Sequence, residues 1–214
     1  MPRGATVITS KRPQLIALRG AAPISDRGSV PDLADAADRE TVERTLDGDT
    51  EAFAGVVRRH GSRLVAICAR VVRDRHVGEE LAQEALARCY SNLGSWRGDG
   101  RFRDWLFRIG MNCCRDYLKA GARAERPAVL AGDELSTARD PESELGGRQL
   151  MAALETEIAR LPPAYRESFV LFHGENLAYD EMHAITGVSV GALKVRVHRA
   201  RLMLRRALGD LLTG

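Results

Sequence analysis

Residues 177–202 read LAYDEMHAITGVSVGALKVRVHRARL, a pattern typical of a helix-turn-helix. Met182 and Ile185 are spaced for the inner face of a short helix. Gly187 is placed to end that helix, because glycine adopts the left-handed backbone conformation at little cost. Ser189 can cap the next helix by accepting a hydrogen bond from a backbone N–H. The stretch therefore predicts two short helices joined by a tight turn.

The second helix of this pair carries basic side chains and no acidic ones. Residues 190–208 lack Asp and Glu and contain Lys194, Arg196, Arg199, Arg201, Arg205 and Arg206. A helix with one sign of charge suits the DNA backbone, where it displaces condensed counterions. Small residues at its start let it approach base edges in the major groove. A solvated basic face on a bundle helix is the alternative. Because the turn, the cap and the lack of acids coincide, the sequence favours DNA contact.

The remaining chain shows helical periodicity broken by two irregular segments. Apolar residues recur at helical spacing between residues 53 and 117 and again from residue 150, and no stretch alternates as a strand does. The irregular segments lack a sustained period, and the second combines Pro, Gly and acidic residues. The prediction is an all-α fold of two small helical domains, divided into a mobile N-terminal tail (1–38), a first domain (39–120), a flexible acidic linker (121–147) and a second domain (148–214).

The composition excludes several classes of protein. The chain of 214 residues has 32 basic and 29 acidic side chains, so its net charge of +3 says less than the distribution of charge. It has no run of about 18 apolar residues that would span a membrane. Basic residues interrupt any secretory signal near the N terminus. We therefore expect a cytoplasmic protein that is not embedded in a membrane.

No set of residues predicts catalysis, a metal or a cofactor. The cysteines have no C-x-x-C spacing and are Cys68, Cys89, Cys113 and Cys114. They are expected to be buried reduced thiols, with a redox or metal role as the alternative. The histidines are scattered, which predicts no metal site, and no nucleophile–base set or phosphate-binding loop is present. We expect a protein that is not an enzyme and takes no small-molecule substrate.

Several blocks resemble the extracytoplasmic-function (ECF) sigma factors of bacterial RNA polymerase, a subfamily of the sigma-70 family. LPPAYRESFVLFHGENLAYDEMHAITGVSVGALKVRVHRARLMLRRAL (161–208) resembles region 4 of these proteins. Three further blocks appear in the order expected of region 2: DTEAFAGVVRRHGSRL (49–64), VGEELAQEALARCY (77–90) and SWRGDGRFRDWLFRIGMNCCRDYL (95–118). The resemblance implies a sigma factor that binds core RNA polymerase, recognises the −35 and −10 promoter elements, melts the −10 region and directs transcription initiation.

The resemblance also implies which residues make each contact. Region 2 would dock on the polymerase clamp through Glu79, Glu80, Gln83, Glu84 and Arg88. It would bind the −10 element through Asn92, Trp96, Arg97, Arg101, Ile109 and Asn112. The recognition helix of region 4 would bind the −35 element through Gly191, Ala192, Lys194, Val195, Arg196, His198 and Arg199.

The sequence departs from the family pattern at several of these positions. Trp96 stands where Phe is usual, and Ala178 stands where a capping Ser is usual. Phe172 and His173 occupy a stretch that is often charged or polar in the family. Val195 replaces a small polar residue and cannot donate a hydrogen bond to a base, although it can contact a thymine methyl.

The alternative function is a stand-alone helix-turn-helix transcriptional regulator, which would bind duplex DNA without polymerase. The region 2 blocks favour the sigma factor, because such a regulator usually has a ligand or receiver domain in that place. The family usually acts with an anti-sigma factor, and we expect such a partner here. Since the chain shows no sensor of its own, the partner is expected to detect the inducing signal.

Overall fold

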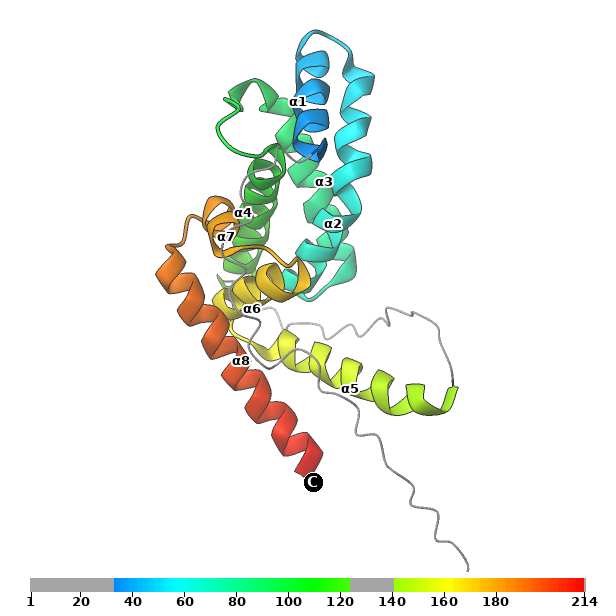
Figure 1. Cartoon of the computed structure of the whole chain (residues 1–214), viewed down its shortest axis with the longest axis vertical. Helices are drawn as coiled ribbons and strands as arrows, with labels where there is room; N and C mark the ends of the chain where they lie inside the picture. The colour runs from blue at the N-terminus through cyan, green and yellow to red at the C-terminus, as the bar shows by residue number, and fades with distance from the viewer. Residues whose placement is uncertain (1–32, 124–140, 214) are drawn as a thin grey trace, which may run out of the picture.

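The computed structural model describes residues 33–123 and 141–213. Every regular element within these ranges is helical, which confirms the all-α prediction, and the elements form two groups (Figure 1). The first group consists of α1 (Leu33–Leu46), η1 (Thr50–Phe53), α2 (Ala54–Val72), α3 (Arg75–Ser91), η2 (Leu93–Ser95) and α4 (Phe102–Arg123). The second consists of α5 (Pro141–Arg160), α6 (Pro163–Phe169), the π-helical turn η3 (Val170–Gly174), α7 (Tyr179–Thr186) and α8 (Val190–Thr213).

The core of the first domain lies where α2, α3 and α4 pack together (Figure 1). Leu64 and Ile67 of α2 are fully buried, as is Phe107 of α4. Val57, which falls in the apolar pattern of α2, is instead 43% exposed. It directly follows the buried Val56, and one residue turns the helix by about 100°. The apolar stripe of α2 is therefore narrower than its sequence pattern indicates.

Helix α1 shows that the described fold starts within the predicted tail. The helix begins at Leu33, whereas the sequence placed residues 1–38 in the tail. Asp38 anchors it: the buried carboxylate accepts a hydrogen bond from Arg59 Nε at 2.7 Å and lies 2.8 Å from His60 Nε2. Burial alone would raise the pKa of Asp38, but the hydrogen bonds with His60 and Arg59 outweigh burial and lower it. Because a polar anchor holds α1, hydrophobic periodicity does not reveal it.

Both ends of the predicted linker are helical. Helix α4 continues to Arg123 and α5 begins at Pro141, whereas the sequence pattern placed the linker at residues 121–147. Residues 124–140, like residues 1–32, lie outside the described ranges. The described helices therefore extend into the predicted linker from both ends.

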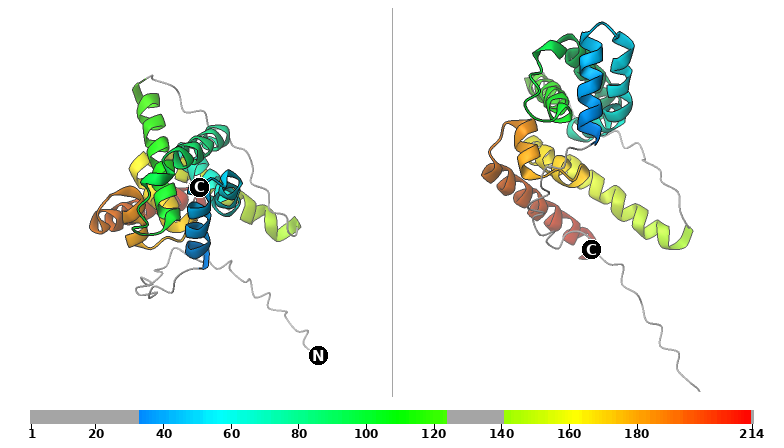
Figure 2. Two further views of the ribbon diagram at one scale, coloured as in Figure 1. Left: turned by 90° about the horizontal axis from the view of Figure 1, so that it is seen from above. Right: turned by 45° about the horizontal axis from the view of Figure 1, so that its top comes forward.

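The two groups of helices pack against each other, with α7 beside α4 (Figures 1 and 2). One buried cluster runs from the core of the first domain to Leu171 and Met182 of the second. At its edge, Arg115 Nη2 of α4 donates to Glu167 Oε1 of α6 at 2.5 Å. The structure therefore shows the two domains in a closed arrangement with a shared apolar core.

Arg166 forms a buried polar link between the domains. Its Nε donates to the carbonyl oxygen of Val71, near the end of α2, at 2.8 Å. Its Nη1 donates to the carbonyl oxygens of Ala159 at 2.9 Å and Leu161 at 3.1 Å. Burial, and then the charge of Arg73, lower the pKa of Arg166 to about 10, so the guanidinium stays charged at neutral pH. Because the last carbonyls of a helix lack partners within it, Arg166 satisfies one at the end of α2.

Candidate nucleic-acid interface

Helices α7 and α8 form the predicted helix-turn-helix. Met182 and Ile185 of α7 are fully buried. Gly187 ends α7 with a φ of 72°, and its N–H donates to the carbonyl oxygen of His183 at 2.8 Å. Ser189 Oγ accepts from the N–H of Ala192 at 3.4 Å, which caps the start of α8. Both the left-handed glycine and the serine cap are therefore confirmed.

The start of α7 lacks a side-chain cap at Ala178 but keeps the glutamate half of a capping box. Ala178 precedes the helix and has no side chain that accepts a hydrogen bond. Glu181 Oε2 accepts from the N–H of Ala178 at 2.8 Å, which is one half of a capping box. Glu181 Oε1 also accepts from Arg103 Nη2 at 2.8 Å and from Arg101 Nη1 at 2.5 Å. The carboxylate that begins α7 is therefore also a link to the first domain.

The face of α8 turned away from the core carries the residues expected to contact the −35 element. The buried face consists of Leu193, Val197, Ala200, Leu204 and Leu208. Five of the expected −35 residues are exposed, namely Gly191, Lys194, Val195, His198 and Arg199, while Ala192 and Arg196 are half-buried. The helix therefore presents its small, basic and histidine side chains on the side opposite its apolar stripe.

Two tyrosines that were not predicted from the sequence support this basic face. Arg199 Nη1 donates to Tyr165 Oη of α6 at 3.2 Å. Lys194 Nζ lies 5.8 Å from the ring centre of Tyr179 of α7. No local sequence signal singles out either tyrosine, because each contact joins different helices.

The residues expected at the −10 element lie partly on α4 and partly in the segment that precedes it. Arg97 and Asn92 are exposed in the segment between α3 and α4, and Arg101 pairs with Asp35 of α1 at 3.2 Å as well as with Glu181. Asn112 is exposed on α4, about three helical turns beyond Arg101. The half-buried Ile109 packs against the core, so Ile109 and Asn112 lie on α4 while the other expected residues precede it.

Trp96 is supported by neighbouring side chains. Its ring meets Phe102 edge to face, with ring centres 5.3 Å apart, and the guanidinium of Arg39 lies 5.4 Å from the centre of the Trp96 ring. Its Nε1 is buried and has no hydrogen-bond partner among the described residues. The indole expected to stack on a base is therefore already part of a packed aromatic pair.

The exposed side of α3 carries the residues expected to dock on polymerase. Glu80, Gln83, Glu84 and Arg88 are exposed, and Glu79 is half-buried. Glu84 pairs with Arg88 at 2.5 Å, one helical turn away. The opposite side of the helix packs into the core through Leu81, Ala85 and Cys89. This surface is therefore polar and rich in carboxylates.

The cysteines are buried, as expected. All four are fully or nearly fully shielded from solvent and make no disulfide. Burial raises the pKa of Cys89 to about 12. The pKa of Cys114 is raised as well, first by its hydrogen bond with Cys68 and then by burial. Because the thiolate is the reactive form, thiols with raised pKa values stay protonated at neutral pH and react slowly.

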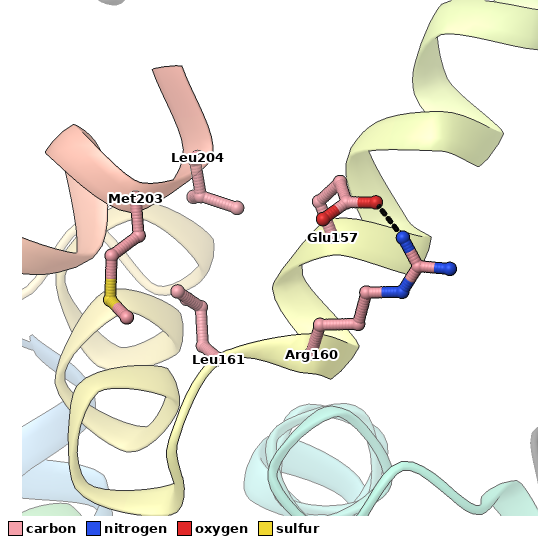
Figure 3. A pocket seen from close by; sticks show the side chains of 5 residues that line it. All are labelled: Glu157, Arg160, Leu161, Met203 and Leu204. Carbon is pink, nitrogen blue, oxygen red and sulfur yellow. Dashed lines mark hydrogen bonds and ion pairs between the residues drawn. The ribbon is translucent and has the colours of Figure 1, made fainter. Parts of the chain in front are cut away.

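A hollow of about 150 Å³ lies between α5 and α8 (Figure 3). It is lined by Glu157, Arg160, Leu161, Met203 and Leu204. Pockets for small molecules usually measure about 300–1,000 Å³, so this hollow is smaller than a typical ligand site. Within the described ranges, no three His, Cys, Asp or Glu side chains come together as metal ligands. None of the described helices has the length and hydropathy needed to cross a membrane.

Comparison with known proteins gives matches in both domains. The family model for sigma-70 region 2 matches residues 56–124, and that for sigma-70 region 4 matches residues 151–204. The RNA polymerase sigma-H factor of Pseudomonas aeruginosa is 31% identical over 82% of this chain and 95% of its own length. The ECF RNA polymerase sigma-E factor of Escherichia coli K12 is 31% identical over 77% of this chain and 90% of its own. The solved structure of CnrH in complex with the cytosolic domain of CnrY aligns with 81% of this chain and 98% of its own, with 26% identity and a TM-score of 0.59.

Proposed function

The chain belongs to the ECF subfamily of the sigma-70 family, and we propose that its two domains divide promoter recognition between them. It is an ECF-type sigma factor, which binds core RNA polymerase and directs transcription initiation. The order of the two matches carries this conclusion, because region 2 and region 4 fall on the first and second domains. The region 2 match also disfavours a stand-alone regulator. We propose that the chain itself is not an enzyme, because the polymerase catalyses RNA synthesis. We also propose that it acts in the cytoplasm.

The second domain is proposed to bind the −35 element through α8. The exposed face of this helix combines basic side chains with two small residues at its start, Gly191 and Ala192. Small residues let the helix approach base edges, and the basic side chains contact phosphates. Val195 is 49% exposed on this face and offers an apolar contact for a thymine methyl.

Removing a basic side chain from α8 is expected to weaken −35-dependent transcription without weakening polymerase binding. Lys194→Ala or Arg199→Ala removes one phosphate contact, so the slope of log affinity against log salt should fall by about 1. Run-off transcription and a salt titration of DNA binding measure the two effects. Arg58→Ala, on the exposed side of α2, is the matched control. Equal loss of polymerase binding would show that these residues serve the fold or the polymerase interface instead.

The first domain is proposed to hold the melted −10 element. Opening the duplex requires a surface that replaces base stacking, and an aromatic ring beside basic residues supplies one. Trp96 has Arg97 and Arg101 close in sequence and is fixed against Phe102. A ring that is already fixed loses little conformational freedom when a base stacks on it. Asn112 and Ile109, further along α4, are proposed to contact the same strand.

Trp96→Ala is expected to impair promoter opening more than promoter binding. Base–aromatic stacking contributes about 1–3 kcal/mol, which corresponds to a loss of about five- to 150-fold in the equilibrium constant for opening. Permanganate reactivity of unpaired thymines measures opening, and a gel shift measures binding. Trp96→Phe, which restores the residue usual in the family, is the control and should keep most of the opening. Equal losses of opening and binding for Trp96→Ala would contradict a stacking role.

An inhibitory partner is proposed to act on the closed arrangement of the two domains. The solved relative CnrH was determined in complex with the cytosolic domain of CnrY. In the present chain, Arg101 of the −10 set is paired with Glu181 of the second domain. The contact between the two domains and the proposed −10 contact therefore both require the guanidinium of Arg101. A partner that stabilises the closed arrangement and covers the exposed side of α3 would block both polymerase and promoter.

A further inference from the structure

Arg201 of α8 is held by an aromatic cluster that the proposed contacts do not use. Its Nε donates to His173 Nε2 at 2.9 Å, and its guanidinium carbon lies 5.2 Å from the ring centre of Phe172. Phe172 is in turn stacked on Tyr179, with ring centres 4.8 Å apart, and His173 packs against Phe169 at 4.6 Å. The groups that hold Arg201 are therefore themselves fixed by packing.

His173 is a neutral acceptor in this cluster. Burial, and then the charge of Arg201, lower the pKa of His173 to about 4. At neutral pH the Nε2 atom therefore carries a lone pair and accepts the hydrogen bond from Arg201. Since Nε is the atom that donates, both terminal amino groups of Arg201 stay available for a bidentate contact.

Lys194 and Arg201 of α8 have uncharged partners, whereas several arginines between the domains pair with carboxylates. Arg115 pairs with the carboxylate of Glu167, and Arg63 pairs with that of Glu175. Among the described residues, by contrast, no carboxylate pairs with Arg201 or Lys194. A carboxylate would orient a cation but would also cancel its field and compete with phosphate. A ring face or a neutral nitrogen orients the cation and leaves its charge intact.

We propose that Arg201 is a further DNA-phosphate contact of α8 and that His173 and Phe172 are positioning residues that hold it in place. Lys194, His198 and Arg201 follow at spacings of four and three, so they lie along one flank of the helix. This flank spans nearly two turns, and Arg201 adds a contact beyond Arg199, the last residue of the expected −35 set. Ordering the long arginine before DNA arrives lowers the entropy lost on binding. This inference rests on the proposed function, because it requires α8 to be the DNA-binding helix.

The test is a salt titration of the full-length chain with a short fluorescent DNA duplex of mixed sequence. Arg201→Gln should lower the slope of log affinity against log salt by about 0.9, the value for one phosphate contact. His173→Leu leaves the charge of α8 unchanged, so a purely electrostatic account predicts an unchanged slope. Positioning predicts instead that the slope falls toward that of Arg201→Gln. His173→Gln keeps a neutral acceptor and should restore the wild-type slope.

A double variant separates positioning from an independent effect. If His173 acts only through Arg201, adding His173→Leu to Arg201→Gln should change nothing further. An additive loss, or a wild-type slope for His173→Leu alone, would overturn the positioning role. A wild-type slope for Arg201→Gln would overturn the phosphate contact.

Two nearly isosteric variants guard against misfolding, and two further variants identify which idea has failed. If circular dichroism shows that His173→Leu is unfolded, His173→Gln and His173→Glu decide the matter, because Glu keeps an acceptor but neutralises Arg201. Their slopes should differ in the native background, because Glu neutralises the guanidinium and Gln leaves its charge intact; equal slopes would overturn the proposal. Lys194→Ala and Arg199→Ala are measured alongside. If they too keep the wild-type slope, α8 does not bind DNA and the proposed function fails; otherwise only the inference about Arg201 fails.

Discussion

The Gly78→Ala variant is expected to destabilise the first domain strongly. A Cβ at this position would lie 2.4 Å from the Cα and 2.5 Å from the backbone nitrogen of Ala69. These are backbone atoms of α2, so α2 and α3 must separate to admit the methyl group. Overpacking costs about 1–3 kcal/mol even where side chains can shift, and we expect at least about 3 kcal/mol here. Urea unfolding followed by circular dichroism measures the change in the free energy of unfolding.

Gly121→Ala provides the matched control. Gly121 lies in α4, where an added methyl group would meet no atom within 4 Å apart from its chain neighbours and the backbone of its own helix. Alanine is favoured over glycine within a helix by about 1 kcal/mol, so this variant should be as stable as the native chain or more stable. An unfolding midpoint for Gly78→Ala equal to that of the native chain would show that α2 and α3 do not cross as closely as the structure indicates.

Reversing the charge of the exposed side of α3 is expected to abolish polymerase binding. Glu80 and Glu84 are exposed there and belong to the proposed clamp-docking set. The proposal requires a polymerase surface that attracts acidic side chains. Replacing both glutamates with arginine would place positive charges against that surface, and such like-charge contacts cost several kcal/mol across an interface. Since about 1.4 kcal/mol is a factor of ten, the affinity for core polymerase should fall by about a hundredfold or more. Competition binding with a labelled native chain measures it.

The control for this double variant changes the same number of charges elsewhere in the first domain. Glu40→Arg with Glu43→Arg alters two exposed acids of α1 and should leave polymerase binding close to native. If both double variants lose affinity equally, net charge governs the association and the α3 surface has no special role.

Local signals predicted the parts of the fold that depend on neighbouring residues. Gly187 ends α7 and Ser189 caps α8 because each acts on backbone groups a few residues away. The apolar stripe of α8 was likewise visible in the spacing of its buried residues. Because these signals act over a few neighbouring residues, the sequence alone was sufficient to predict the helix-turn-helix.

Features that depend on distant contacts were not predictable in this way. Asp38 fixes α1 through Arg59 and His60 of α2, and the hydrophobic periodicity of the sequence does not reveal such an ion pair. The closed arrangement depends on pairs such as Arg63 with Glu175, which are 112 positions apart. Trp96 was expected to contact the −10 element, but its packing against Phe102 and Arg39 depends on contacts that a search for motifs does not detect.

The residues that surround the basic face of α8 were missed for the same reason. His173 was one of several scattered histidines in the sequence, and only the fold places it against Arg201. The one available signal was that Phe172 and His173 occupy a stretch that is often charged or polar in the family. In the structure, His173 is a neutral acceptor at this place instead of a charged group.

Reconstituted run-off transcription tests the central claim most directly. The purified chain and bacterial core RNA polymerase are combined with genomic promoter fragments, and each component is also tested alone. A sigma factor should give transcripts from a subset of promoters only when both proteins are present, together with weak duplex binding by the chain alone. Tight, site-specific DNA binding by the chain without polymerase, and no transcript with it, would contradict a sigma factor and indicate a stand-alone regulator.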